Sequence, residues 1–251
     1  MNQGIELNDL TKSYGAKLAV AGISLSIKPG EIFGLLGPNG AGKTTTLKML
    51  AGILRPDSGA RSICGFDVEQ EPLKAKQCLG FIPDDPFIYE KLSGREFLHL
   101  VARLYGCSNE GLEQRVDELI DRFEAREWID RRAEGYSHGM RQKTVLAATL
   151  LHQPKVYLID EPLVGLDPAS IILVKKIFQE EAQKGCALLV STHTLSLAES
   201  TCHRIGVIAN GRLAALGTLK ELRELSQHRH QDLESLYLEF TRSNEQSTLS
   251  N

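Results

Sequence analysis

This chain of 251 residues has little that would place it in a membrane, in an oxidising compartment or on nucleic acid. No apolar run approaches the ~20 residues that a membrane-spanning helix needs, and we expect no signal peptide before the fold. The net charge of −3 argues against a protein that wraps nucleic acid by bulk electrostatics. Five cysteines are scattered without a C-x-x-C pair: Cys64, Cys78, Cys107, Cys186 and Cys202. Disulfides and structural zinc are therefore not expected, and the pattern favours a reducing cytosol.

The composition that remains is typical of a globular protein, with 42% hydrophobic and 24% charged residues. A chain of this length forms one large domain or two closely joined ones, with enough apolar residues for a real core. Function must therefore be sought in local motifs.

The most specific motif fits the pattern G-x-x-x-x-G-K-[ST] of a phosphate-binding loop. Its residues are Gly37, Pro38, Asn39, Gly40, Ala41, Gly42, Lys43, Thr44 and Thr45. Glycines let the backbone curl round an anion, so that successive N–H groups face the β- and γ-phosphates of a nucleotide. Lys43 adds a charge on those phosphates, and the Thr44 hydroxyl can ligate Mg²⁺. An apolar run at 32–36 and a helical segment at 43–54 flank the motif, which predicts a nucleotide-binding site.

Two stretches ahead of this loop, at 5–10 and 20–27, alternate apolar and polar residues as half-buried strands do. An antiparallel layer in this place would be unusual for a small-molecule kinase. Tyr14 lies between the two predicted strands, and two interpretations of it remain open. Its ring stacks on a purine, a contact worth about 1–3 kcal/mol, or it packs within a loop.

An acidic loop follows a short predicted strand at 79–82. Asp84 and Asp85 lie between Pro83 and Pro86 at the end of that strand, where α/β proteins place ligand groups. Either carboxylate could reach Mg²⁺, its waters or a neighbouring domain. A solvated turn accounts for the same composition.

Between residues 93 and 151 the pattern changes to long helical periods, which predicts an inserted helical subdomain. One apolar stripe contains Leu112, Val116, Leu119, Ile120 and Phe123, and a second contains Phe97, Leu98, Leu100, Val101 and Leu104. Ser137 is a favoured N-cap residue ahead of a predicted helix at 143–151. With Gly139 it forms a second anion site at a helix start, separate from the first.

The apolar run at 156–159 predicts a strand that is buried on both faces of a parallel sheet. Asp160 and Glu161 follow at its C-terminal edge, beside the phosphate-binding loop. Asp160 can hold Mg²⁺ through water, and Glu161 can orient or deprotonate an attacking water. His193 follows another buried strand at 187–190 and can contact a γ-phosphate, although a lone histidine is more often structural.

In this order the motifs resemble those of the ATP-binding subunits of ATP-binding-cassette (ABC) transporters, over about residues 4–225. The resemblance implies an α/β fold: a P-loop NTPase with a RecA-like parallel sheet core, an N-terminal antiparallel β-layer and an inserted α-helical subdomain. The implied boundaries are 1–86 and 153–226 for the ATP-binding core, 87–152 for the helical subdomain and 227–251 for a C-terminal helix and flexible tail.

The resemblance also implies roles for individual residues. Tyr14 corresponds to the adenine-stacking aromatic, 37–45 to the Walker A loop, Ser137–Met140 to the signature motif, and 166–167 to the D-loop. Asp160 corresponds to the Walker B aspartate, and the implied metal ligands are Thr44, Asp84 and Asp160. Glu161 corresponds to the catalytic base, His193 to the switch histidine, and Lys43 to a further catalytic group.

The implied cofactors are ATP and Mg²⁺. Two such subunits join head to tail, so that each γ-phosphate lies between the phosphate loop of one subunit and the signature helix of the other. ATP binding then closes the dimer and hydrolysis opens it, as a population shift. The helical insert would pass this motion to a separate transmembrane permease. The subunit would be cytoplasmic, on the inner face of the membrane, with no nucleic-acid partner.

Three features depart from the family pattern. Asp84 replaces the usual glutamine, and a carboxylate donates no hydrogen bond unless it is protonated. The usual signature Leu-Ser-Gly-Gly-Gln is Tyr136-Ser137-His138-Gly139-Met140 here, a variant that resembles single-domain ATPases of bacterial export-type transporters. The polar tail at 227–251 has an amphipathic stretch: Leu233, Leu236, Tyr237 and Phe240.

Alternatives come from other classes of protein. A non-transport ABC-type ATPase acting on DNA or ribosomes should have a long coiled-coil insert or a second cassette, and the sequence has neither. A small-molecule kinase would share 37–45 but would have no use for the Ser137 helix or His193. A third alternative, a regulatory nucleotide-binding module with impaired hydrolysis, remains because Asp84 replaces the usual glutamine.

Overall fold

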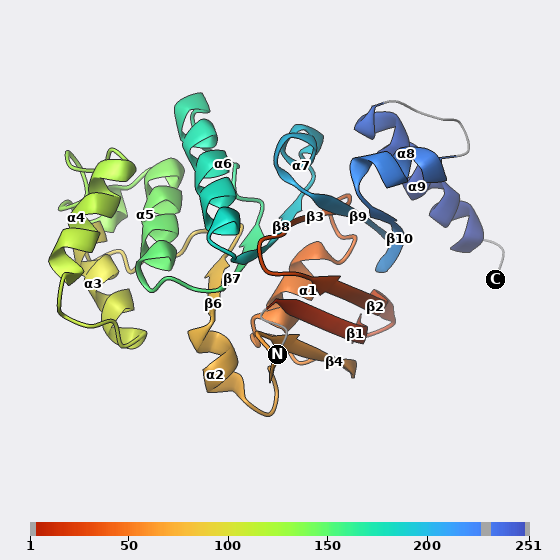
Figure 1. Ribbon diagram of the computed structural model, residues 1–251, viewed down its shortest axis with the longest axis horizontal. Helices are drawn as coiled ribbons and strands as arrows, with labels where there is room; N and C mark the ends of the chain where they lie inside the picture. The colour runs from red at the N-terminus through yellow and green to blue at the C-terminus, as the bar shows by residue number, and fades with distance from the viewer. Residues whose placement is uncertain (1–3, 227–231, 249–251) are drawn as a thin grey trace.

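A computed structural model describes residues 4–226 and 232–248, which form two sheets surrounded by helices (Figure 1). The larger sheet has six strands in the order β10-β9-β3-β8-β7-β6. Their bounds are Ile32–Leu36 (β3), Leu79–Ile82 (β6), Val156–Asp160 (β7), Ala187–Thr192 (β8), Arg204–Ala209 (β9) and Arg212–Gly217 (β10). Neighbouring strands are parallel except β9 and β10, which pair antiparallel. The predicted parallel core is confirmed.

The smaller sheet is the predicted antiparallel layer, with strand order β2-β1-β4-β5. The bounds are Ile5–Tyr14 (β1), Lys17–Ile27 (β2), Ser58–Ile63 (β4) and Phe66–Asp67 (β5). Strand β1 continues to Tyr14, beyond its predicted end at Leu10, because Tyr14 pairs with Lys17 across a tight turn. Gly15 makes this turn with a φ of 57°. Tyr14 therefore ends a strand at the tip of a hairpin.

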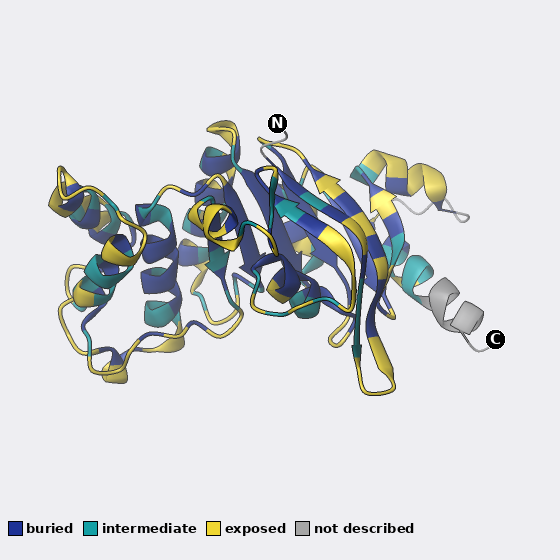
Figure 2. Cartoon of the chain, turned by 90° about the horizontal axis from the view of Figure 1, so that it is seen from below, coloured by how far each residue is buried: buried dark blue, intermediate teal, exposed yellow. Residues whose placement is uncertain are grey.

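Helix α1 (Lys43–Leu50) lies between the two sheets (Figure 1). Its Leu47 and Leu50 share one buried cluster with Leu158 of β7 and Leu189 of β8. Helix α6 (Pro168–Gln183) covers the opposite face of the larger sheet, where the strand residues of that face join a second cluster. Both faces are thus covered, and the central strands are buried along their length (Figure 2). Only the ends of these strands remain for polar chemistry.

Helices α3 (Gly94–Leu104), α4 (Leu112–Arg122) and α5 (His138–Leu151) pack together beside the larger sheet (Figure 1). The apolar stripe predicted for α4 is confirmed, since Leu112, Val116 and Ile120 are buried. The stripe predicted for α3 is wrong at its end. Leu98 is fully buried, whereas Leu104 is 75% exposed because α3 ends there.

The remaining helices of the described chain are α2 (Pro72–Gln77), α7 (Leu195–Thr201), α8 (Leu219–Leu225) and α9 (Leu233–Thr248). Leu233 and Leu236 of α9 are buried in a third cluster with residues of β9 and β10. Residues 227–231 and 249–251, which belong to the predicted tail, lie outside the described residues. Across 4–226 and 232–248, no helix combines the length and apolar character that crossing a bilayer requires.

Two glycines fix the backbone between β3 and α1. Helix α1 ends at Leu50, short of the predicted end at residue 54, and it begins after Gly42, whose φ is 110°. A Cβ on Gly42 would lie 2.4 Å from the carbonyl oxygen of Ala19 in β2. Gly40 has a φ of 79°, but the atom nearest to an added Cβ is Lys17 Nζ at 3.9 Å. Both glycines are left-handed, and of the two it is Gly42 that is crowded by backbone.

We expect Gly42→Ala to lower the free energy of unfolding by about 2–5 kcal/mol. A left-handed conformation costs a non-glycine residue about 1–2 kcal/mol, and overpacking adds about 1–3 kcal/mol. Gly40→Ala is the matched control, and it should lose only about 1–2 kcal/mol. Urea unfolding followed by circular dichroism measures both losses. Equal losses of unfolding free energy in the two variants would contradict the inference that β2 crowds Gly42.

Candidate functional site

A cavity of about 260 Å³ opens at the C-terminal ends of the parallel strands. It lies between the β1–β2 hairpin and the loops that follow β3, β6 and β7. Its lining residues are Tyr14, Lys17, Ala19, Asn39, Gly40, Gly42, Lys43, Thr44, Thr45, Asp84 and Glu161. The fold thus brings together predicted site residues from four separate segments of the chain.

The loop between β3 and α1 is held in shape by its neighbours. A Cβ on Gly37 would lie 2.5 Å from the carbonyl oxygen of Ile208 in β9, so this position has no room for a side chain. Within the loop, Ala41 N donates to the Pro38 carbonyl at 3.2 Å, and Gly211 N donates to the Ala41 carbonyl at 3.1 Å. The backbone at 37–42 is therefore fixed by β9 and by its own turn.

Lys43 lies at the floor of this loop and is only 5% exposed. Its ammonium donates to the carbonyl oxygens of Gly37 at 2.7 Å and Pro38 at 3.2 Å. Its Nζ also lies 3.6 Å from Glu161 Oε1. A buried ammonium needs such partners, since removing a charge from water is costly. An anion entering the cavity would meet a cation that is already held in place.

Asp160 is the last residue of β7 and is 1% exposed. Ser191, its neighbour across the sheet in β8, donates its hydroxyl hydrogen to Oδ1. Oδ2 has no hydrogen-bond partner among the described residues. Burial raises the pKa of Asp160, and the hydrogen bond from Ser191 opposes this shift. A buried carboxylate oxygen without a partner is costly, so this edge suits a cation or a further donor.

Glu161 follows directly and has a φ of 46°, which is uncommon for a residue other than glycine. Its Oε1 lies 2.9 Å from His193 Nδ1. Thr192 Oγ1 donates to Oε2 at 3.3 Å. The Glu161 carboxylate thus lies between the Lys43 ammonium and the end of β8, at the wall of the cavity.

Tyr14 and Asp84 lie at the rim of the cavity. The Tyr14 side chain is 51% exposed at the end of β1, so its ring is not enclosed by the fold, and stacking on a purine stays a prediction. Asp84 is exposed on the loop after β6 and is close enough to Asp160 for its charge to raise the Asp160 pKa.

Ser137 and Gly139 lie elsewhere. Ser137 is the N-cap of α5, as predicted, and its Oγ accepts a hydrogen bond from Met140 N at 3.2 Å. The ring of His138 packs on Gly165, where an added Cβ would lie 2.5 Å from His138 Cδ2. Among the described residues that line the cavity, none comes from 137–140. The two predicted anion cradles, the loop at 37–45 and the start of α5, are therefore separate within one chain.

Several residues of the site were missed by the sequence analysis. Lys17 lines the cavity. The sequence feature that could have indicated this is the turn at Gly15, which pairs Lys17 with Tyr14. Ser191 orients Asp160, but a serine within a strand has no distinguishing pattern. Gln142 of α5 is 1% exposed and donates to the Pro162 carbonyl at 3.4 Å. This bond links the helix of the second cradle to the segment after β7.

Most of the chain matches known proteins of one family. Residues 20–164 match the family model described as ABC transporter. The chain is 35% identical over 238 residues to the ABC-type transporter ATP-binding protein EcsA of Bacillus subtilis (strain 168), covering 95% of this chain and 96% of that protein. It is 34% identical over 239 residues to the ABC transporter ATP-binding protein NatA of the same organism, covering 93% and 96%.

Solved structures give the same result. The chain superposes with a TM-score of 0.89 and 35% identity on a structure described as the ATP binding subunit of an ABC transporter. The match covers 94% of this chain and 98% of that one. The fold, the phosphate-binding loop and these relatives agree, and the chain therefore belongs to the ABC transporter family, as one of its ATP-binding subunits.

Proposed function

We propose that this subunit hydrolyses ATP with Mg²⁺, as one of two cassettes that close head to tail around two nucleotides and drive a separate membrane permease. The observation that supports this most is the presence of two incomplete anion cradles in one chain. The first lies in the cavity around Lys43, and the second is the capped start of α5 at Ser137.

ATP occupies the cavity with its phosphates in the loop at 37–45. Lys43 then turns its donors from the carbonyls of its own loop toward the β- and γ-phosphates, which stabilises the bound triphosphate. The adenine stacks on Tyr14, whose half-exposed ring is available on the cavity wall. Base stacking of this kind contributes about 1–3 kcal/mol.

The residues at the edge of the sheet fit a hard cation. Asp160 Oδ2 is buried without a hydrogen-bond partner among the described residues, and oxygen is the ligand that Mg²⁺ prefers. Asp160 and the Thr44 hydroxyl would hold the metal, and Asp84 would be a further carboxylate ligand at the rim of the cavity. Bound Mg²⁺ would offset charge on the β- and γ-phosphates.

Glu161 is the general base that takes a proton from the attacking water. Its carboxylate already faces the Lys43 ammonium at 3.6 Å and His193 at 2.9 Å. Arrival of a γ-phosphate draws Lys43 away, which leaves Glu161 free to accept a hydrogen bond from water. His193 holds the carboxylate in place and senses the terminal phosphate.

The second cradle completes the site of a partner subunit. The N-terminal N–H groups of α5 attract negative charge, yet this helix start lies outside the cavity of its own chain. In a head-to-tail pair it binds the γ-phosphate held by the other phosphate loop. ADP lacks that group, so hydrolysis weakens the contact and the pair opens.

An apolar groove supports the permease partner. It has a volume of about 320 Å³ and lies between the loop after β6 and helices α3 and α5. Phe87 and Tyr105 at its wall are 67% and 40% exposed, and such apolar surface marks interaction sites. Phe87 shares one short loop with Asp84. We propose that the permease binds here, on the cytoplasmic face of the membrane, and that 87–152 move relative to 1–86 and 153–226.

We expect Glu161→Gln to lower kcat for ATP hydrolysis by about 10²–10⁴-fold, the usual contribution of a general base. ATP affinity should be kept, because the phosphate loop is untouched, and ATP should then hold the dimer closed. Phosphate release measures turnover, and Glu199→Gln, on the exposed face of α7, is the matched control. Turnover at the parental rate would show that Glu161 is not the base.

We expect Lys43→Ala to weaken ATP binding by about 10- to 150-fold, since hydrogen bonds to charged groups contribute about 1.5–3 kcal/mol. Isothermal titration calorimetry with ATP measures this loss. Lys48→Ala is the control, because Lys48 is an exposed lysine in the last turn of the same helix. If both variants bind ATP as tightly as the parent, the cavity is not the phosphate site.

A further inference from the structure

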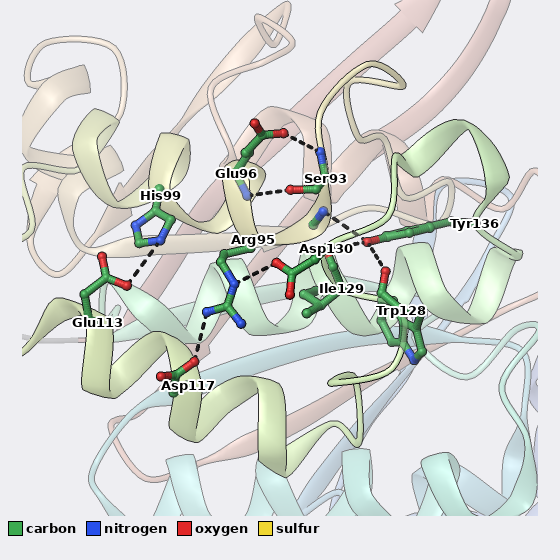
Figure 3. A network of polar contacts seen from close by, with 11 residues as sticks. Ser93, Arg95, Glu96, His99, Glu113, Asp117, Trp128, Ile129, Asp130 and Tyr136 are labelled. Carbon is green, nitrogen blue, oxygen red and sulfur yellow. Dashed lines mark hydrogen bonds and ion pairs between the residues drawn. The ribbon is translucent and has the colours of Figure 1, made fainter.

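The residue directly before the second cradle has an unusual set of contacts. Tyr136 is only 6% exposed, and its hydroxyl lies between two segments of the helical part (Figure 3). The hydroxyl donates to the Ile129 carbonyl at 2.8 Å, with the Trp128 carbonyl as a second acceptor at 3.1 Å. It also accepts a hydrogen bond from Gly94 N at 3.0 Å. Both its donor and its acceptor capacity are therefore in use.

Gly94 N belongs to the start of α3. The first four N–H groups of a helix have no partner within the helix. Ser93 and Glu96 form a capping box in which Glu96 N donates to Ser93 Oγ at 3.2 Å and Ser93 N donates to the Glu96 carboxylate at 2.7 Å. The Tyr136 hydroxyl satisfies one more of these groups, and it does so from the residue beside the cap of α5.

Backbone bonds join the same two segments. Ala133 N donates to the Leu92 carbonyl at 2.8 Å, and Glu134 N donates to the Glu90 carbonyl at 3.1 Å. The segment at 90–94 continues from the loop that holds Asp84 at the rim of the cavity. The segment at 133–136 leads into Ser137. The segment that precedes the second cradle, 133–136, is thus hydrogen-bonded to the segment at 90–94.

The ring of Tyr136 has a packing role that does not need the oxygen. Trp128 lies edge-on to it, with ring centroids 5.1 Å apart. A phenylalanine would make the same contact, whereas a buried hydroxyl is costly unless it is hydrogen-bonded. Burial raises the pKa of Tyr136, so the hydroxyl keeps its proton and stays a donor. The presence of a hydroxyl at this position is therefore explained by the hydrogen bonds with which it joins Gly94 to the Trp128 and Ile129 carbonyls.

We propose that the Tyr136 hydroxyl is a positioning group that holds Ser137–Gly139 in a fixed orientation relative to the segment at 90–94. The second cradle and this segment then move as one body when ATP binds. A cradle without this bond would have to be ordered during dimer formation, which weakens association. The inference rests on the proposed function, because the cradle acts on the nucleotide of a partner subunit.

Neighbouring ion pairs supply a matched control. Arg95, next to Gly94, pairs with Asp117 of α4 at 2.9 Å and with Asp130 at 2.8 Å (Figure 3). These bonds join α3 to α4 and to the loop after it, and the Arg95 side chain forms no hydrogen bond or ion pair with Tyr136 among the described residues. Arg95→Gln therefore loosens the same region while leaving the Tyr136 bonds in place.

The test uses the full chain with Glu161→Gln, in which ATP is expected to trap the dimer. Adding Tyr136→Phe should raise the dissociation constant of the ATP-bound dimer by about five-fold or more, because one buried N–H loses its partner. Sedimentation equilibrium measures this constant. ATP affinity of the dilute monomer should stay unchanged. Adding Arg95→Gln instead should leave the dissociation constant within about two-fold of that of the Glu161→Gln chain. This should hold even if Arg95→Gln lowers the melting temperature as much as Tyr136→Phe does.

A second variant disturbs the bond from the other side. A Cβ on Gly94 would lie 2.8 Å from the Tyr136 oxygen, so Gly94→Ala should displace the hydroxyl and weaken the dimer as Tyr136→Phe does. The proposal is overturned if both variants dimerise like the parent, or if Arg95→Gln weakens the dimer equally. If Glu161→Gln alone forms no dimer with ATP, the proposed function is wrong, which is a different outcome.

Discussion

The buried charge of Lys43 is the interaction on which the rest of the site depends. At 5% exposure the ammonium has exchanged water for two carbonyl oxygens of its own loop and for the carboxylate of Glu161. These partners come from the start of the phosphate-binding loop and from the residue after β7, so one cation fixes their spacing. Under the proposed function, a triphosphate has more negative charge than Glu161 and competes with it for the same ammonium.

The sheet explains why this chemistry gathers at one edge. Helix α1 covers one face of the central strands and α6 covers the other, which leaves these strands without exposed side chains. Asp160, Glu161 and His193 follow the apolar runs directly, where the strands emerge from the core. The second cradle depends on a different constraint. It is built on α5, which is joined to the start of α3 by the bond between Gly94 N and the Tyr136 hydroxyl, and to the segment after β7 by the bond from Gln142 to the Pro162 carbonyl.

Much of the fold could be predicted from local sequence, and the failures have physical causes. The strand at 156–160, the loop at 37–45 and the cap at Ser137 follow from patterns that are complete within a few residues. Strand β9 was missed because it pairs with β3, which is distant in sequence, and β10 was missed together with β9, its hairpin partner. The hydrogen bond from Gly94 N to the Tyr136 hydroxyl joins residues 42 positions apart, and no periodicity in the sequence predicts such a contact. The left-handed backbone of Glu161 likewise depends on its surroundings.

The register of β3 has a consequence for how the protein is made. Its only partners in the described sheet are β8 at 187–192 and β9 at 204–209, although β3 itself is at 32–36. Contacts of such long sequence separation form slowly. On the ribosome the phosphate-binding loop is thus synthesised early but gains its supports only after most of the chain has emerged. Until then the nascent chain exposes the apolar residues of β3, so chaperone protection during translation matters more for this fold than for one built from neighbouring segments.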